Sequence, residues 1–495
     1  MSGSGPVPHR ALITGCTMIA TLMQALDSTI ANVALPYMQG SLSATYDQVT
    51  WILTSYVIAS AIMTAPVGWL SARFGRKNLL MVCLLGFTVT SMLCGAAQTL
   101  SQMVVFRLAQ GTFGAALVPL SQTTMLDIYP IEKRAQAMAV WGIGVMVGPI
   151  LGPTLGGYLT DAYNWRWVFY VNLPFGVAAI AGLWLFMPKD NPNATLQFDW
   201  TGFSVLALGI GAFQLMLDRG QDQDWFASGE IITEAVLAGL GLYLFVVHLC
   251  TAERSFIPLG VFKDRNFVAA VVMMFAIGMV LLASSALLAP YLQNLASYPV
   301  AATGIAMAPR GIGTMAAMML AGRLGGRFDQ RKLMATGLLM LSGSLYAMSG
   351  WTPDIDEHQL LLVIVLQGFG MGLIFNPLSV MAFATLPAQF RGDGAALLSL
   401  FRNIGAAIGV SVTAFSLTRG TQTSHAGLAA MATPFNRVLQ SGPLNLTHPH
   451  SMQTLDGMIN RQALIIAYNN DYLMMTLVTL PALLLLLFMR RPVAK

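Results

Sequence analysis

Charged residues are scarce in this sequence. Only 9% of its 495 residues are Asp, Glu, Lys or Arg, whereas 56% are hydrophobic, and the mean hydropathy is +0.65. Soluble domains average about 25% charged residues, so a water-soluble globular protein is excluded. A chain of this composition must bury most of its length in apolar surroundings, and the core of a lipid bilayer provides them. We therefore expect a membrane protein.

The sequence also lacks the motifs of several catalytic and metal sites. Its four cysteines show no C-x-x-C spacing, which indicates small packed side chains rather than disulfides or zinc ligands. No G-x-x-x-x-G-K-[ST] segment is present to hold nucleotide phosphates, and no H-E-x-x-H segment to hold zinc. We accordingly predict neither an enzyme nor an ATP-driven pump, and expect no metal, no cofactor and no nucleic-acid partner.

Long apolar stretches, in contrast, recur along the whole chain. A helix needs about 20 apolar residues to cross a hydrocarbon core of roughly 30 Å. Stretches near that length predict an all-α polytopic protein with fourteen transmembrane helices, at residues 11–35, 49–72, 79–97, 101–125, 136–159, 166–187, 200–217, 230–250, 266–292, 301–322, 333–350, 359–382, 394–416 and 467–489.

The positions of Lys and Arg predict the orientation of these spans. Most of the 26 Lys and Arg residues fall on one set of alternating loops, the set that is cytoplasmic if the N-terminus is inside. Because positive residues favour the cytoplasmic side, we expect both termini to be cytoplasmic. The longest polar segment, about residues 418–467, then lies outside. We interpret it as a solvated loop, with a docking surface as the alternative.

Two similar loops indicate an internal duplication. Residues 68–77, after the second span, and residues 322–332, after the tenth, share Gly, Leu, Arg and Phe at identical offsets, followed by basic residues. Six-helix halves related in this way are a known transporter design. The loops are too far apart for six spans alone, so we predict an N-terminal six-helix bundle (1–187), an inserted helix pair with linkers (188–265) and a C-terminal six-helix bundle (266–495).

Five segments in order carry a resemblance to a known family: residues 26–36, 68–77, 107–114, 144–157 and 165–176. With them the chain resembles the fourteen-helix EmrB/QacA-type drug:proton antiporters of the major facilitator superfamily over essentially its whole length. The resemblance implies a major facilitator fold in the bacterial cytoplasmic (inner) membrane and export of small molecules in exchange for protons. It also implies a periplasmic adaptor and an outer-membrane channel as partners. One departure is Ala72, where the wider superfamily has Asp, so no gating pair through that position is expected.

Asp27 is the most informative polar residue. A charge in mid-membrane costs roughly 2.5–3.5 kcal/mol on insertion scales and usually marks an ion or substrate path. Asp27 in the first span and Arg107 in the fourth lie at comparable depths from the same surface, so the two can pair. We predict that Asp27 couples transport to protons and that Arg107 tunes it, a role that the resemblance also implies for this arginine. A fixed structural ion pair is the alternative.

Other polar or small residues in the spans extend the candidate site. Gln24 lies one turn before Asp27 and Gln110 three residues after Arg107. For both, substrate contact and simple interhelical hydrogen bonding are equally open. The complete set of further candidates comprises Gln24, Gln110, Tyr291, Gln293 and Asn376 for substrate binding, and Arg73, Gly144, Gly148, Pro149, Gly152 and Arg310 for gating or structure, with substrate binding as the alternative for Arg310. The glycines recur every fourth residue and form a flat stripe for close helix packing. Beyond such packing, we expect their helix to seal the two halves against leak.

The favoured function is therefore proton-coupled export of hydrophobic or amphipathic small molecules by alternating access. One alternative keeps the fold but exports a single endogenous metabolite or siderophore. A second alternative is a non-transporting membrane scaffold, against which the costly Asp27 argues.

Overall fold

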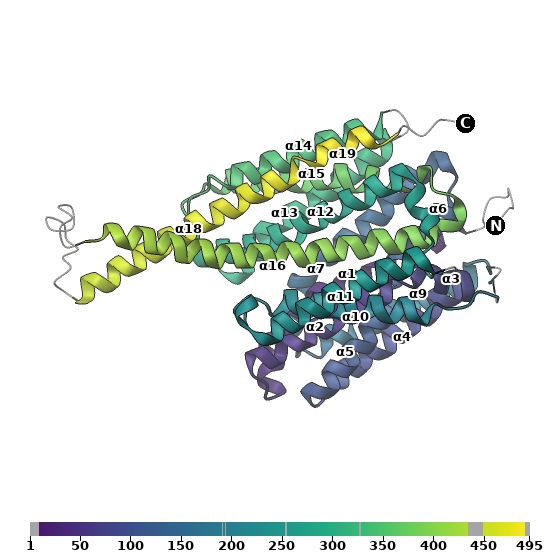
Figure 1. Cartoon of the computed structure of the whole chain (residues 1–495), viewed down its shortest axis with the longest axis horizontal. Helices are drawn as coiled ribbons and strands as arrows, with labels where there is room; N and C mark the ends of the chain where they lie inside the picture. Colours follow the sequence, from purple (N-terminus) through teal and green to yellow (C-terminus); the bar gives the residue numbers. More distant parts are fainter. Residues whose placement is uncertain are drawn as a thin grey trace.

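The computed structural model describes residues 9–190, 192–193, 195–252, 255–325, 328–433 and 449–490. All regular structure in these residues is helical. Figure 1 shows a bundle of long helices in which the two chain ends lie at the same end, here called the terminal end. The all-α architecture is confirmed.

The first six predicted spans form the N-terminal half. Three of them are broken into two helices, and the break between α2 and α3 bends the chain by 59°. The helices are α1 (Arg10–Ser41), α2 (Tyr46–Thr64), α3 (Val67–Phe74), α4 (Arg76–Ala96), α5 (Leu100–Gly114), α6 (Leu117–Ile128), α7 (Arg134–Ala162), α8 (Trp167–Tyr170) and α9 (Asn172–Phe186).

The remaining spans comprise the inserted pair and the C-terminal half. The pair is α10 (Trp200–Arg219) and α11 (Gly229–Thr251). The half contains α12 (Arg265–Pro290), α13 (Val300–Leu324), α14 (Gln330–Met348), α15 (Glu357–Ala384), α16 (Arg391–Met431), α18 (Pro449–Thr479) and α19 (Ala482–Phe488). Short 3-10 turns lie at Ile131–Lys133, Trp225–Ala227, Leu259–Lys263 and Ala388–Phe390, and a π-helical turn at Tyr291–Leu295.

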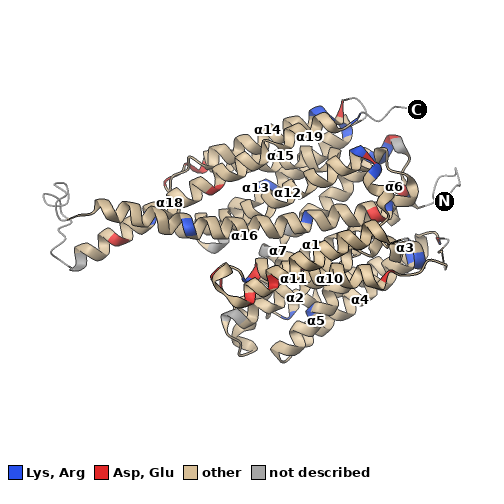
Figure 2. Cartoon of the chain, viewed as in Figure 1, with Lys and Arg blue, Asp and Glu red and all other residues tan. Residues whose placement is uncertain are grey.

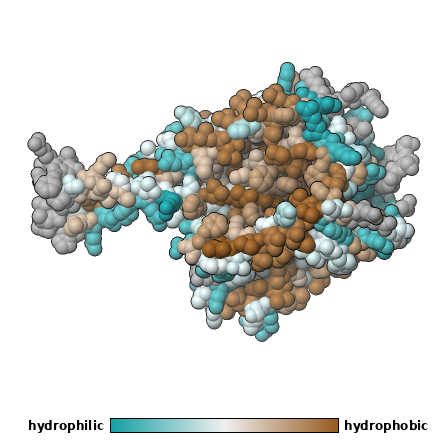
Figure 3. All heavy atoms as spheres, in the orientation of Figure 1, coloured by the Kyte–Doolittle hydropathy of each residue, from teal (hydrophilic) through white to brown (hydrophobic). Residues whose placement is uncertain are grey.

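Every predicted span has a helix at its position. Eleven described helices are long and apolar enough to cross a membrane, or twelve if the bent pair α2 and α3 forms one span. The two remaining predicted spans, α13 and α14, pack within the same bundle, α13 against α7 and α15 and α14 against α15. Apolar side chains cover the flank of the bundle in Figure 3. Charged residues gather mainly toward its ends in Figure 2, as a membrane-embedded bundle requires.

The two halves meet along a seam that runs from mid-bundle to the terminal end. Trp141 of α7 stacks on Phe375 of α15 with ring centroids 6.1 Å apart. Nearer the terminal end, Arg391 of α16 pairs with Asp127 of α6 at 2.7 Å. A Cβ atom on Gly68 of α3 would lie 2.7 Å from the Cα atom of Asp393. The described contacts therefore hold the halves together at the terminal end.

The inserted helix α10 contacts both halves near the opposite end. The hydroxyl of Thr54 in α2 hydrogen-bonds to the Asp218 carboxylate of α10. From the other side, Ser411 of α16 donates to the Leu217 carbonyl oxygen at 2.6 Å. The insertion therefore links α2 and α16 rather than lying apart from them.

The expectation of a loop at residues 418–467 is wrong for the residues that the structure describes. Residues 418–431 continue α16, and residues 449–467 begin α18; residues 434–448 lie outside the described part. The two helices project from the bundle as a hairpin in Figure 1, and His425 hydrogen-bonds across it to Asp456 at 3.1 Å. At 1.5 Å per residue, the 41 residues of α16 extend about 60 Å, roughly twice the bilayer core.

Candidate functional site

The site around Asp27 is built where α1 packs closely on α7. A Cβ atom on Gly148 of α7 would lie 2.5–2.7 Å from the backbone of Ala25 and Leu26. The Thr29 hydroxyl of α1 also donates to the Gly148 carbonyl oxygen at 3.3 Å. Only glycine permits this close approach of α7 to α1. Asp27, on the same helix α1, contacts residues of α5 and α9.

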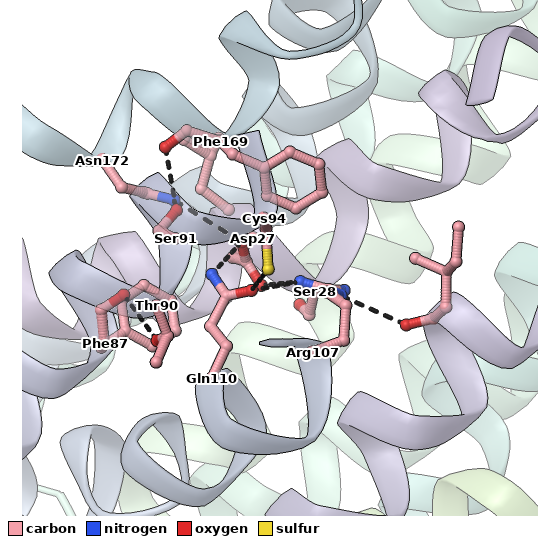
Figure 4. Close-up of polar contacts among 12 residues, drawn as sticks. Asp27, Ser28, Phe87, Thr90, Ser91, Cys94, Arg107, Gln110, Phe169 and Asn172 are labelled. Atoms are coloured by element: carbon pink, nitrogen blue, oxygen red, sulfur yellow. Dashed lines mark hydrogen bonds and ion pairs between the residues drawn. The ribbon is translucent and has the colours of Figure 1, made fainter. Parts of the chain in front are cut away.

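Asp27 accepts hydrogen bonds from three helical side chains (Figure 4). Its Oδ2 atom lies 2.7 Å from Nη1 of Arg107, and its Oδ1 atom lies 2.8 Å from Nε2 of Gln110. Nδ2 of Asn172 approaches Oδ1 at 3.5 Å. The prediction that Asp27 and Arg107 lie at the same depth and pair is confirmed.

Arg107 is held by more than the carboxylate. Its Nη1 atom also donates to the Gln110 Oε1 atom at 2.8 Å, and its Nε atom donates to the Ile52 carbonyl oxygen at 3.2 Å. The guanidinium carbon lies 4.4 Å from the ring centroid of Tyr56, within the range of a cation–π interaction. The arginine therefore keeps favourable contacts that do not depend on the charge of Asp27.

The pair is closed to solvent in this conformation. Asp27, Arg107, Gln110 and Asn172 are all 0% exposed, so the carboxylate faces protein and not lipid. Both carboxylate oxygens are hydrogen-bonded, as a buried charge must be to offset the loss of its hydration. Proton exchange with water therefore requires a second conformation that opens a path to Asp27.

Asn172 and Ser91 belong to this site although their individual roles were not predicted. Asn172 Nδ2 donates to the Ser91 hydroxyl at 3.0 Å, and that hydroxyl donates to the Phe169 carbonyl oxygen at 2.8 Å. Asn172 lies in the family-like segment 165–176, and an amide in an apolar stretch was the available signal. Ser28 and Asn32, one turn apart on α1, are exposed beside the buried pair and offer polar groups for a path.

The predicted substrate-contacting residues are dispersed. Gln110 belongs to the Asp27 site, and the half-buried Gln24 lies near Tyr56. Asn376 of α15 instead donates across the seam to the Ala135 carbonyl at 3.4 Å, and within its own half to the Met318 carbonyl at 3.2 Å. Tyr291 is buried in the π-helical turn that follows α12, where Gln293 is exposed. Substrate contact by these residues stays a prediction.

The glycine stripe faces away from the seam, although its helix α7 does contact α13 and α15 of the other half, so a sealing role of α7 stays a prediction. Gly144, Gly148 and Gly152 all face α1 in the same half, with Met18, Ala25 and Thr29 as their respective neighbours. Contacts of α7 with α13 come from other positions, such as Gly142 against Met318. Sequence spacing identified the flat face of the helix but could not identify its partner.

The remaining gating candidates are placed as follows. Pro149 lies within α7, and Arg73 is half-buried in α3. The ion pairs to Asp127 at this end come from Arg76 and Arg391 rather than from Arg73. Arg310 lies inside the C-terminal half, 8% exposed.

No group of three or more His, Cys, Asp or Glu residues in the described chain could hold a metal ion. The polar groups of the Asp27 site are instead suited to binding and releasing a proton, or to fixing α1, α5 and α9 to one another.

Comparison with known proteins decides the family. A model of the Major Facilitator Superfamily matches residues 17–410. The chain belongs to the Major Facilitator Superfamily. The protein is similar to multidrug export protein EmrB of Escherichia coli (strain K12), with 33% identity over 97% of the chain and 95% of EmrB. It is also similar to fatty acid resistance protein FarB of Neisseria gonorrhoeae, with 33% identity covering 94% and 92%.

Solved structures agree on the superfamily fold. The crystal structure of the human organic anion transporter MFSD10 (TETRAN) matches with a TM-score of 0.63 and 14% identity, over 97% of this chain and 100% of that one. At that identity the likeness shows the fold alone. The superfamily chain is thus a multi-pass membrane transporter related to EmrB-type multidrug exporters, and not an enzyme.

Proposed function

We propose that the chain exports hydrophobic or amphipathic small molecules by alternating access, in exchange for protons taken up through Asp27. The observation that carries the proposal is the fully buried Asp27–Arg107 pair at 2.7 Å. A carboxylate inside a membrane bundle is expensive and typically marks an ion path. Asp27 can change its charge, whereas arginine stays protonated, so the proton belongs on Asp27.

The contacts of Arg107 suit a carboxylate that alternates between two charge states. When Asp27 accepts a proton, the attraction between the two side chains is lost. Arg107 then still donates to Gln110 and Ile52 and still lies over Tyr56. The released Asp27 weakens the hold of α1 on α5, which supplies a link between protonation and helix movement.

Alternating access also requires contacts between the two halves that can break at one end, and the seam contains such contacts. The Arg391–Asp127 pair is partly exposed, with side chains 17% and 24% accessible. Partly exposed pairs contribute only about 0–1 kcal/mol, so such a contact can separate and re-form during rocking of the halves.

Transport in sealed vesicles tests the proton role. We expect Asp27→Asn to insert and fold but to abolish transport of a fluorescent amphiphile driven by a pH gradient, because an amide cannot carry the proton. The matched control is Asp161→Asn, a carboxylate that accepts a hydrogen bond from Tyr37 at 2.7 Å on the exposed surface. Normal gradient-driven transport by folded Asp27→Asn would assign the pair a structural role instead.

The names of the two relatives support small-molecule export but differ in the substrate they indicate. EmrB is named a multidrug export protein and FarB a fatty acid resistance protein. A panel of unrelated dyes and drugs, assayed with and without a protonophore, separates multidrug export from export of one endogenous metabolite. Flux of several unrelated compounds, lost with the protonophore, is the expected result.

The orientation and the partners complete the proposal. Basic residues concentrated toward the terminal end favour a cytoplasmic location for both termini, in the inner membrane of a bacterium. The hairpin of α16 and α18 would then project into the periplasm, where an adaptor leading to an outer-membrane channel could bind it. Shortening both arms of the hairpin equally should lower whole-cell resistance while sparing vesicle transport; loss of both together would indicate a folding role.

A further inference from the structure

Arg310 of α13 is a buried arginine whose hydrogen-bond partners are all neutral. Its Nη1 atom donates to the Ser285 hydroxyl at 2.7 Å. Its Nη2 atom donates to the Ser284 hydroxyl at 2.9 Å and to the Leu281 carbonyl oxygen at 3.2 Å. Among the described residues, no Asp or Glu forms an ion pair with it.

An unpaired charge at this depth needs an explanation. Removing a charge from water costs several kcal/mol, and protein interiors normally return part of that cost through a counter-ion. Three of the five N–H donors of the guanidinium are used in the bonds above. The remaining donors and the whole positive charge are available to a group from outside the chain.

A buried hydroxyl without a hydrogen-bond partner, that of Tyr472, lies next to this arginine. Tyr472 of α18 is 0% exposed, its hydroxyl has no hydrogen-bond partner, and it lies close enough to Arg310 for the two groups to interact electrostatically. Tyr291 is likewise 0% exposed with an unpartnered hydroxyl, and its ring centroid lies 6.5 Å from that of Tyr472. An unsatisfied buried hydroxyl costs about 1–3 kcal/mol, so the Tyr472 hydroxyl beside Arg310 too indicates a missing acceptor.

The position of Arg310 suits a transported ligand rather than a fixed one. The next residue, Gly311, packs against Ile150 of α7, so α13 runs along the seam between the halves at this level, while the Arg310 side chain turns to α12. Arg310 keeps 8% exposure, whereas Arg107 keeps none. Trp351 and the two tyrosines place aromatic surface near the donors, with centroids 5.8 Å apart for Tyr291 and Trp351.

We infer that Arg310 and the hydroxyl of Tyr472 bind the negative group of an organic anion, such as an aromatic carboxylate, as part of the substrate path. Carboxylates accept charge-assisted hydrogen bonds from guanidinium donors with particular strength. The inference rests on the proposed export function and narrows its substrate class. It assigns to Arg310 a specificity role, the alternative to the structural or gating role that the sequence favoured, and names the chemistry of the ligand.

Binding of three probes that differ in charge tests the site. The full-length protein in lipid nanodiscs is titrated calorimetrically with 1-naphthaleneacetate, its neutral methyl ester and 1-naphthylmethylammonium. For Arg310→Gln we expect about a tenfold or larger loss of affinity for the anion and little change for the ester, because a charge-assisted hydrogen bond is lost. Arg310→Lys, which keeps the charge, should retain most of the anion affinity.

Two further variants keep the test decisive. Tyr472→Phe removes a single hydroxyl and should weaken only anion binding. The control Arg402→Gln removes another arginine of the C-terminal half. The hydrogen bonds of Arg402, all at 3.4 Å, go to Ser399 and Asn403 of its own helix. This variant should leave the preference for the anion over the ester unchanged. Unchanged anion affinity in folded Arg310→Gln, an equal loss for all three probes, or an equal loss in Arg402→Gln would overturn the inference.

The binding assay needs no proton gradient, which separates this inference from the proposed function. Asp27→Asn should bind 1-naphthaleneacetate as the wild type does while losing gradient-driven flux. Normal gradient-driven flux with Asp27→Asn would contradict the proton role of Asp27 without affecting the proposed anion site. Normal anion affinity in Arg310→Gln would do the reverse.

Discussion

In the N-terminal half, Arg107 lies 2.7 Å from the carboxylate of Asp27, and neither side chain is exposed. In the C-terminal half, Arg310 is almost as deeply buried but donates only to two serines and a carbonyl oxygen. The first arrangement can change its net charge by taking up a proton within the chain. The second forms no ion pair with any described residue, so we propose that a group from outside the chain supplies its counter-charge. The comparison suggests that one half carries the coupling ion and the other recognises the cargo.

The largest expected contrast is in stability. Arg107→Gln leaves the Asp27 carboxylate buried without its cation, and breaking such a pair costs about 3–5 kcal/mol. Arg310→Gln removes a charge that has no internal counter-ion, so we expect a cost below about 1 kcal/mol or a gain. Thermal unfolding of both variants in the same nanodiscs measures the difference. Equal destabilisation would mean that Arg310 has a partner within the protein.

A glycine supports each arginine site, and enlarging it should disturb both halves. A Cβ atom on Gly148 would collide with the α1 backbone beside Asp27, and one on Gly368 of α15 would lie 2.7 Å from the carbonyl carbon of Arg310. We expect each alanine substitution to cost about 1–3 kcal/mol from overpacking. The control is Gly157→Ala, also in α7, where the added atom meets nothing within 4 Å. Destabilisation by the control as well would point to a general intolerance of α7.

Supplying Arg310 with a counter-ion should make the C-terminal half resemble the N-terminal one. Ser285→Asp places a carboxylate where the hydroxyl now lies 2.7 Å from Nη1. Because the internal carboxylate competes with the probe, affinity for 1-naphthaleneacetate should fall about tenfold, with the methyl ester little affected. Ser285→Asn, of the same size and uncharged, is the control. Tighter anion binding in the aspartate variant would contradict the assignment.

The smallest effect on stability is expected at the seam. Asp127→Asn removes the charge that pairs with Arg391 and Arg76 in a partly exposed setting, which is worth about 0–1 kcal/mol. Access should respond more than stability does, because this contact closes the terminal end. Labelling of a cysteine introduced at Ser71, after removal of native thiols that react, should become faster in Asp127→Asn. An unchanged rate would show that other seam contacts keep that end closed.

Much of the fold could be predicted because a bilayer imposes a strong pattern. Every span was visible as an apolar stretch, and the depth of Asp27 and Arg107 followed from counting residues along two helices. The hairpin was missed for the converse reason. Residues 418–431 and 449–467 are polar and project from the bundle, so they carry no span-length signal, although Ala-Gly-Leu-Ala-Ala-Met at 426–431 contains several good helix formers.

The charged pair of the site could be predicted from the sequence, whereas the neutral residues around it could not. Asp27 and Arg107 stood out because charge is rare in the spans. Asn172 and Ser91 come from α9 and α4 and meet Asp27 only through tertiary packing. The glycines of α7 showed a flat face, but α1 and α13 were equal candidates to cover it. The neutral surroundings of Arg310 likewise depend on which residues of α12 face α13.

One helix joins the gate to the distant tip. α16 begins two residues before Asp393, at the terminal end of the seam, and continues without interruption to Met431 in the projecting hairpin. A rigid rod about 60 Å long that tilts by about 10° moves its far end by roughly 10 Å. Each turnover of the C-terminal half would therefore swing the tip like a lever. A protein bound to that tip would therefore be displaced each time the transporter changes the side of the membrane to which it opens.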